Sequence, residues 1–265
     1  MGVLGRRLAG KSKRRGFTVV LVLLHHILVT YAVDAFSQSN PVPINIAVPR
    51  VANLLEENNS GIYQKIFEEA LPEPGVLGYR ISQPFFPYKR ALNVFLSNSV
   101  DCVYSFTKVA ERELGKEKVI ASFPLGAFGY FMFSRKEEKP LTRPEQLIGK
   151  RVGGVVGHDS YYQSAIGDLN LHLVTSDEQN IELLKLGRID HLIGAIPDIL
   201  PYAGELSYSL DAPLVKSFDR ITCHNNEQNR QFLSVLSSRL RELKQQGGYQ
   251  RLAGSLYLDF DESKQ

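Results

Sequence analysis

The chain has 265 residues, of which 43% are hydrophobic and 22% are charged, and its formal net charge is +3. This composition is that of a folded globular protein and excludes a low-complexity chain. The basic excess does not indicate a nucleic-acid partner, because six of the 31 basic residues lie within the first fifteen positions. Residues 1–35 hold those six and one of the 28 acidic residues, so 25 basic and 27 acidic residues remain in a slightly acidic chain.

Residues 1–35 have the pattern of a secretory signal peptide. The basic start is followed by an apolar core from Phe17 to Val33, and Val33 and Ala35 are small residues at −3 and −1 of a cut after Ala35. We therefore predict export and cleavage. An uncleaved anchor is the alternative, but its seventeen-residue core is short against the ~20 residues that a membrane span needs.

Two cysteines, Cys102 and Cys223, lie outside this segment. An oxidising compartment would allow them to pair, but their spacing alone does not decide it. Cys102 falls in a predicted buried strand, where free cysteine is common. The sequence therefore favours two free thiols and leaves a disulfide open.

Strands and helices alternate along the predicted chain. Strands over 44–48, 77–82 and 100–105 are separated by amphipathic helices over 61–71 and 88–96, a β-α-β-α-β run that builds a right-handed open sheet. Further strands are expected at 119–122, 128–134, 189–196, 206–210 and 214–223, with a last long helix striped by Phe232, Leu233, Leu236, Leu240 and Leu243.

One pattern occurs twice. A helix, a turn, an aspartate and a buried strand follow one another around Asp101 and again around Asp190, where Gly187 can end the helix in a left-handed conformation. This duplication predicts two similar α/β lobes. The order of the elements, the Gly187-Arg188-Ile189-Asp190 motif and the closing Leu-Lys-x-x-Gly-Gly-Tyr-x-x-Leu resemble the family 3 extracellular solute-binding proteins, the two-lobed periplasmic receptors of ABC importers.

The resemblance implies the α/β, type II periplasmic-binding-protein architecture. Lobe one is expected to hold residues 36–126 and 219–265, and lobe two residues 127–218. The strands over 128–134 and 214–223 are expected to lie side by side as the hinge.

No enzyme, metal or cofactor site is predicted. His158, Asp159 and Ser160 have the residue types of a nucleophilic triad, but triads gather from separated segments and not from one loop. The four histidines beyond residue 35 show no metal-ligand spacing.

A ligand site is predicted instead, because open α/β sheets bind ligands beyond the carboxyl ends of their strands. Ser160 and Tyr161 open a helix whose free N–H groups favour an anion, and aromatic rings supply the walls of a cleft. For two of the candidates, Arg50 and Arg90, the alternative is a solvated surface charge. The candidate binding residues are Arg50, Phe86, Tyr88, Arg90, Ser105, Arg112, His158, Asp159, Ser160 and Tyr161.

The resemblance also bears on the ligand. Amino-acid binders of the family carry Thr-x-x-Arg, whose arginine grips the α-carboxylate; with one deletion, Arg112 matches that arginine. The family's ammonium-binding aspartate lies five residues after the Asp of Gly-Arg-x-Asp, where this chain has Ala195. Unless Asp159 or Asp198 substitutes for it, we expect a carboxylate or other small polar solute and not an ordinary α-amino acid.

The predicted function is that of a secreted, periplasmic monomer that captures a small polar solute between two lobes for an ABC permease. A sensing module that signals to a membrane receptor is one alternative, and a periplasmic dehydratase-like enzyme on the same fold is another. A filled cleft between the lobes would favour a module that binds protein, and an acid–base pair facing the cleft would favour an enzyme.

Overall fold

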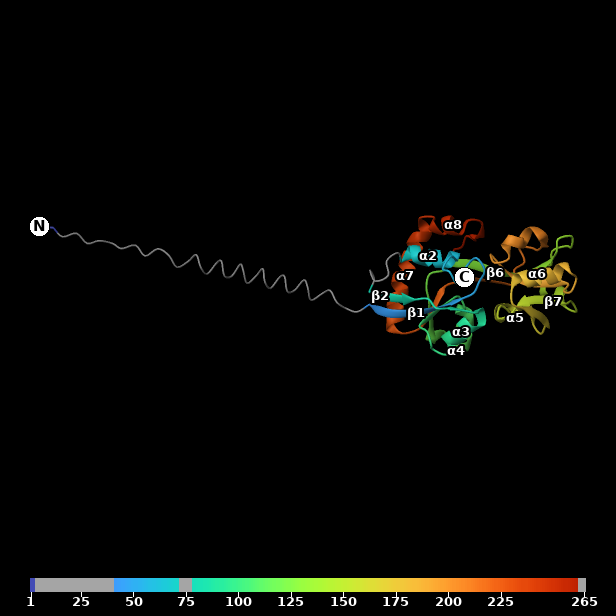
Figure 1. Cartoon of the computed structure of the whole chain (residues 1–265), viewed down its shortest axis with the longest axis horizontal. Coiled ribbons are helices and arrows are strands. Elements are labelled where there is room, and N and C mark those ends of the chain that lie inside the picture. Colours follow the sequence, from blue (N-terminus) through green and yellow to red (C-terminus); the bar gives the residue numbers. More distant parts are fainter. Residues whose placement is uncertain (3–40, 72–77, 262–265) are drawn as a thin grey trace. The chain divides into compact units, whose positions relative to one another are not determined.

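The computed structural model describes residues 1–2, 41–71 and 78–261 (Figure 1). Apart from residues 1–2, the predicted signal peptide and its cleavage site lie outside these ranges. Residues 43–265 group into one unit by their contacts, and the account below concerns that unit. Within the described ranges, no helix is long and apolar enough to cross a membrane.

The first sheet combines strands from both ends of the chain. Its order is β2-β1-β4-β12-β5, and β3 pairs with β1. β4 is parallel to β1, whereas β12 returns antiparallel to β4. The strands are β1 (Val42–Pro49), β2 (Tyr79–Ser82), β3 (Phe85–Phe86), β4 (Cys102–Tyr104), β5 (Val119–Ala121) and β12 (Ile221–His224).

The second sheet comes from the middle of the chain. Its order is β10-β6-β9-β7-β8, and β11 pairs with β6. β7 is parallel to both β8 and β9. The strands are β6 (Gly126–Arg135), β7 (Val152–Val155), β8 (Leu171–Val174), β9 (His191–Ile196), β10 (Leu206–Ser207) and β11 (Val215–Asp219).

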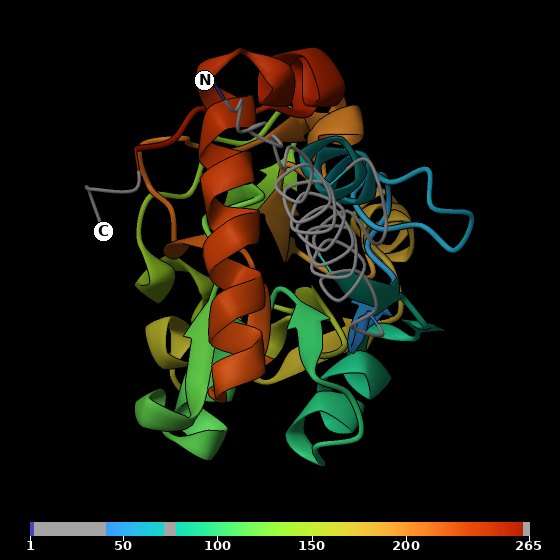
Figure 2. The ribbon, with the colours of Figure 1, turned by 90° about the vertical axis from the view of Figure 1, so that its left-hand side faces the viewer.

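Helices cover both faces of each sheet, so the central strands β4, β7 and β9 are buried at every position. In β1, Ile46 joins the core under α2 and α7, and Ala47 joins the core under α3 and α4. The apolar stripe predicted for the last long helix is buried along α7. This helix is the long orange-red one in Figure 2. The helices are α2 (Ile62–Ala70), α3 (Tyr88–Leu96), α4 (Thr107–Leu114), α5 (Asp159–Ile166), α6 (Asp177–Lys185), α7 (Glu227–Gln245) and α8 (Gly248–Ala253), with short 3-10 turns at Lys116–Lys118, Pro144–Leu147, Leu200–Glu205 and Gly254–Leu256.

The two strands that connect the sheets lie side by side, as predicted. β11 runs antiparallel to β6, with Val215 opposite Tyr130 and Asp219 opposite Gly126. The single strand expected over 214–223 is in fact two, because the chain passes from the second sheet to the first at Arg220. The Arg220 guanidinium donates a 2.7 Å hydrogen bond to the carbonyl of Ser122. We call the part with the first sheet lobe one and the part with the second sheet lobe two; their boundaries at 126 and 219 stay a prediction.

The duplicated aspartates have one structural role. Asp101 accepts a 2.8 Å hydrogen bond from the backbone N–H of Asn45, and its own N–H donates to the Asn45 carbonyl. Asp190 accepts from the backbone N–H of Arg151 at 2.9 Å and pairs with its guanidinium at 2.6 Å. Each aspartate thus holds its strand in register with the neighbouring parallel strand, β1 or β7.

Cys102 and Cys223 form a disulfide, so the preference for free thiols was wrong. The two residues are directly opposite on β4 and β12, with their Cα atoms 4.0 Å apart. The pairing depends on the return of the chain to the first sheet after 121 residues, which the local pattern around Cys102 does not contain.

Candidate ligand-binding site

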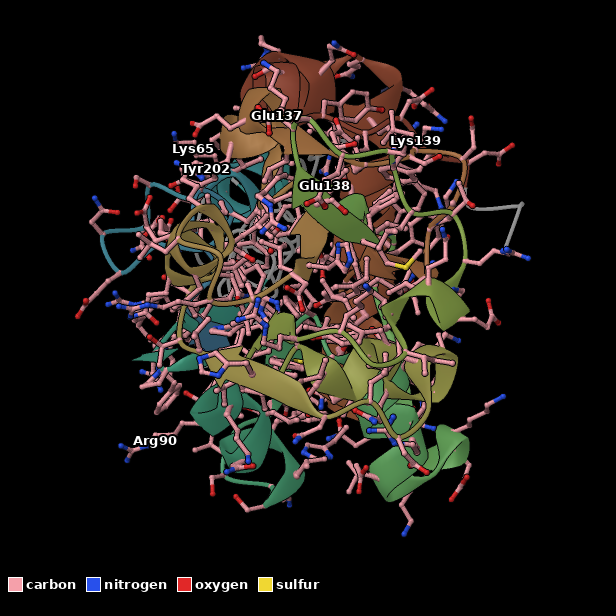
Figure 3. The ribbon with its side chains drawn as sticks, turned by 90° about the vertical axis from the view of Figure 1, so that its right-hand side faces the viewer. Lys65, Arg90, Glu137, Glu138, Lys139 and Tyr202 are labelled. Atoms are coloured by element: carbon pink, nitrogen blue, oxygen red, sulfur yellow. A yellow bond between two sulfur atoms is a disulfide. The ribbon has the colours of Figure 1, made fainter. Side chains whose placement is uncertain are left out.

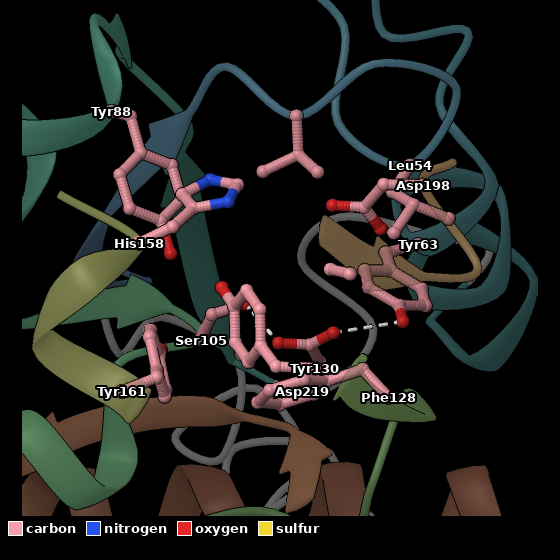
Figure 4. A pocket seen from close by; sticks show the side chains of 12 residues that line it. Leu54, Tyr63, Tyr88, Ser105, Phe128, Tyr130, His158, Tyr161, Asp198 and Asp219 are labelled. Carbon is pink, nitrogen blue, oxygen red and sulfur yellow. Dashed lines mark hydrogen bonds between the residues drawn. The ribbon is translucent and has the colours of Figure 1, made fainter. Parts of the chain in front are cut away.

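A cavity lies between the two lobes, at the carboxyl ends of strands from both sheets (Figure 4). Its volume of ≈ 20 Å³ is enough for about one water-sized group. Lobe one contributes the turn after β4 and the start of α3, and lobe two contributes β6, β9 and the start of α5. The lining residues are Val51, Leu54, Tyr63, Tyr88, Ser105, Phe128, Tyr130, His158, Tyr161, Ala195, Asp198 and Asp219.

Four of the ten predicted site residues line this cavity: Tyr88, Ser105, His158 and Tyr161. The side chains of the three ring-bearing residues make contacts across the lobes. The Tyr88 ring centroid lies 4.5 Å from that of His158, and the Tyr161 hydroxyl accepts a 2.9 Å hydrogen bond from the backbone N–H of Phe106. Ser105 and Phe106 have φ angles of 67° and 60°, a strained left-handed turn of the kind that gathers at functional sites.

The predicted arginines lie elsewhere. Arg50 is exposed and is 3.6 Å from Glu57. Arg90 is exposed and points away from the molecule, with its guanidinium over the ring of Phe86, a half-buried residue packed against α3 and α4 (Figure 3).

Arg112, expected to bind a ligand carboxylate, is also outside the cavity. Its exposed guanidinium donates to the carbonyl of Ser160 at 3.1 Å and to Glu113. The first turn of α5 is likewise engaged, since Asp159 accepts from the N–H of Gly157 and the Ser160 hydroxyl donates to the Gly157 carbonyl. An anion at this helix start would face the Asp159 carboxylate, so the expected anion site is already taken by an acid of the chain.

The polar groups of the cavity are acidic. Asp219 is 8% exposed; it accepts hydrogen bonds from the Ser105 hydroxyl at 2.6 Å and from the Tyr63 hydroxyl at 2.9 Å (Figure 4). Burial raises the pKa of Asp219 to about 6, although both hydrogen bonds act to lower it. Burial, with the charges of Asp177 and Asp219, raises the pKa of Asp198 well above its usual range.

No basic residue balances these carboxylates, since the lining contains neither lysine nor arginine. Burial lowers the pKa of His158 to about 4, so its imidazole is neutral at physiological pH. The described part of the chain also contains no group of three or more His, Cys, Asp or Glu side chains placed to hold a metal ion. The cavity therefore combines aromatic walls, two carboxyl groups and a neutral imidazole.

No family model and no curated protein matches the chain. Solved structures do match it. The GluR0 ligand-binding core from Nostoc punctiforme, solved with L-glutamate, has a TM-score of 0.65 and 19% identity, over 81% of this chain and 99% of that one. A variant of ArgBP from T. maritima has a TM-score of 0.61 and 18% identity, over 84% and 97% of the two chains. A histidine kinase sensor domain with similarity to periplasmic binding proteins has a TM-score of 0.62 and 16% identity, over 83% and 97%.

The chain has the two-lobed fold of the periplasmic binding proteins. This confirms the predicted α/β architecture and, at the level of fold, the resemblance on which it was based. At these identities the likeness is one of fold, so the ligands of the neighbours are not transferred to this chain.

Within this periplasmic-binding-protein fold, sequence reasoning missed Tyr63, Phe128, Tyr130 and Asp219 as cavity residues. Asp219 carried a usable signal, because an acid at the end of an apolar strand between Phe218 and Ile221 needs a buried partner. Asp198 was named only as a substitute for the acid missing at Ala195, and both of these residues line the cavity. The other missed residues come from a helix and a strand whose inward faces depend on the lobes meeting.

Proposed function

We propose that the protein is an exported, monomeric solute-binding protein that captures a small molecule between its lobes and passes it to an ABC permease. One observation carries this proposal: the polar groups of Asp198 and His158, which accept no hydrogen bond from a described side chain, face a cavity formed jointly by the two lobes. The paired strands β6 and β11 provide the hinge about which the lobes open and close.

Thermal unfolding of the purified full chain against a solute library tests the proposal. A ligand that binds the folded state raises the unfolding midpoint by mass action. A matched pair of variants locates the binding. Ala195→Leu, at a lining position that is 3% exposed, fills the cavity and should abolish the shift, whereas Ala212→Leu, in the loop before β11, should preserve it. A shift retained by Ala195→Leu would place the ligand elsewhere.

A sensory module that binds a protein and not a solute is the second candidate, favoured by the small volume of the cavity. Side chains of both lobes already occupy most of the space, and one structure with this fold is a histidine kinase sensor domain. A protein that binds a partner and not a solute should show no shift with any library compound.

An enzyme on this fold is the remaining alternative, because Asp198 and His158 both face the cavity and could act as an acid and a base. NMR of library compounds incubated with the protein tests it by detecting new products.

The location of the protein is part of the proposal. N-terminal sequencing of the periplasmic fraction should begin at Phe36, directly after the predicted cut. Recovery of the chain in the membrane fraction with residues 17–33 still attached would contradict export as a free receptor.

A further inference from the structure

We propose that the ligand is a small protonated amine without a carboxylate group. This inference rests on the proposed solute-binding function and specifies its ligand class. It keeps the expectation that ordinary α-amino acids bind poorly, but it reverses the charge of the expected ligand.

The first argument is the charge of the cavity. The carboxyl groups of Asp198 and Asp219 point into it, and no lysine or arginine lines it (Figure 4). Ionised carboxyl groups in a water-poor space are costly unless a cation pairs with them. An organic acid would add a further negative charge, and Arg112, the expected partner for it, is exposed and bound to Ser160.

The second argument is the balance of hydrogen-bond donors and acceptors. The hydroxyl groups of Tyr63 and Ser105 already donate to Asp219, and the backbone N–H of Phe106 donates to Tyr161. In contrast, no described side chain donates to the Asp198 carboxylate. A ligand that pairs with the Asp198 carboxylate supplies donors to it, as a primary ammonium does with its three N–H groups.

His158 gives an independent indication of the same kind. Its side chain is 7% exposed and points into the cavity, and among the described residues its ring nitrogens have no hydrogen-bond partner (Figure 4). A neutral imidazole offers one nitrogen as an acceptor. An unpartnered acceptor that faces the cavity is accounted for by a bound N–H donor.

The third argument is the aromatic wall. Tyr130 lies 5.7 Å from Tyr161 and 5.9 Å from His158 between ring centroids, and Phe128 is 5.4 Å from Tyr161. Ring faces attract a cation through their quadrupole, most strongly where water is excluded. The volume of ≈ 20 Å³ suits a single ammonium head group in the closed form, and the rest of the ligand requires the lobes to open.

Titration calorimetry of the full chain at pH 7.5 tests the inference. The probes are ethanolamine and putrescine (amines without a carboxylate), choline (a cation without N–H donors), L-alanine and L-arginine (amines with a carboxylate), and succinate. We expect at least one of the two amines to bind with micromolar affinity, choline to bind at least about tenfold more weakly for lack of N–H donors, and succinate to give no heat.

Variants tie the binding to the cavity. Asp198→Asn and Asp219→Asn should each weaken amine binding by about tenfold to a hundredfold, because each removes a charge-assisted hydrogen bond. Asp211→Asn removes an exposed carboxylate outside the cavity and should leave the affinity unchanged. Circular dichroism confirms that each variant is folded.

The outcomes separate this inference from the proposed function. Tight binding of succinate or of an amino acid without binding of either amine would overturn the amine and retain a solute-binding protein. Amine binding that survives both aspartate variants would also overturn it, because the site would lie elsewhere. No heat from any probe, together with no thermal shift across the solute library, would overturn the proposed function itself.

Discussion

Replacing Asp219 by asparagine is expected to stabilise the unliganded protein at neutral and alkaline pH. The side chain is buried, and asparagine keeps both hydrogen bonds: its carbonyl accepts from one hydroxyl, and its amide donates to the other, which can rotate. The substitution therefore removes the charge of the group with little change in its packing.

The expected gain in the free energy of unfolding follows from the raised pKa of Asp219. The Asp219 carboxyl has a folded-state pKa of about 6 against its ordinary value of 3.8, and each pKa unit corresponds to about 1.4 kcal/mol. Because the folded chain holds this proton more tightly, the penalty of the buried charge is fully present above pH 6 and is lost as the pH falls toward 4. Asp219→Asn should raise the free energy of unfolding by up to roughly 3 kcal/mol at pH 8 and by little at pH 4.

The difference between the two proteins is the quantity to measure. His158 has the opposite effect on the pH dependence, because its pKa is lowered to about 4 and the unfolded chain takes up that proton first as the pH falls below 6.5. Urea unfolding of both proteins at pH 8 and pH 4, with Asp211→Asn as the control, cancels this contribution. A variant that is less stable than the parent at pH 8, or a difference that does not shrink at pH 4, would refute the reasoning.

Three further predictions follow from described contacts. Tyr161→Phe leaves a backbone N–H of lobe one without its acceptor and should lower the free energy of unfolding by about 1–3 kcal/mol; an unchanged urea midpoint would count against the cross-lobe bond. Replacing Cys102 and Cys223 by alanine should cost about 2–5 kcal/mol, and a reductant should destabilise the parent but not the double variant. Amine affinity should fall as the pH drops through about 6, where Asp219 gains its proton while His158, with a pKa of about 4, is still neutral; burial also raises the pKa of Asp198, so its titration acts in the same direction. Calorimetry from pH 8 to pH 5 that shows constant affinity would contradict this.

The fold was largely predictable because its signals are local. The spacing of apolar residues in α7 and the repeated pattern around Asp101 and Asp190 each lie within a short window. The site was not predictable in the same way, because it is formed by the pairing of strands that lie far apart in the sequence. Asp219 reaches the cavity only because β11 pairs with β6, and Cys223 meets its partner only because β12 pairs with β4. Arg112 matched a family motif in sequence, yet its side chain is exposed and donates to the Ser160 carbonyl outside the cavity.

The duplicated aspartates, Asp101 and Asp190, lie at the opposite ends of their strands from the residues that line the cavity. Asp101 precedes β4 and Asp190 precedes β9, so both act at the amino ends, whereas Ser105 and Asp198 follow the carboxyl ends of the same strands. The residues that maintain the scaffold are therefore spatially distinct from those that line the cavity. A designer could exchange the cavity side chains as a set while leaving the register of both sheets untouched. For the same reason, a motif such as Gly187-Arg188-Ile189-Asp190 indicates the fold but does not indicate the ligand.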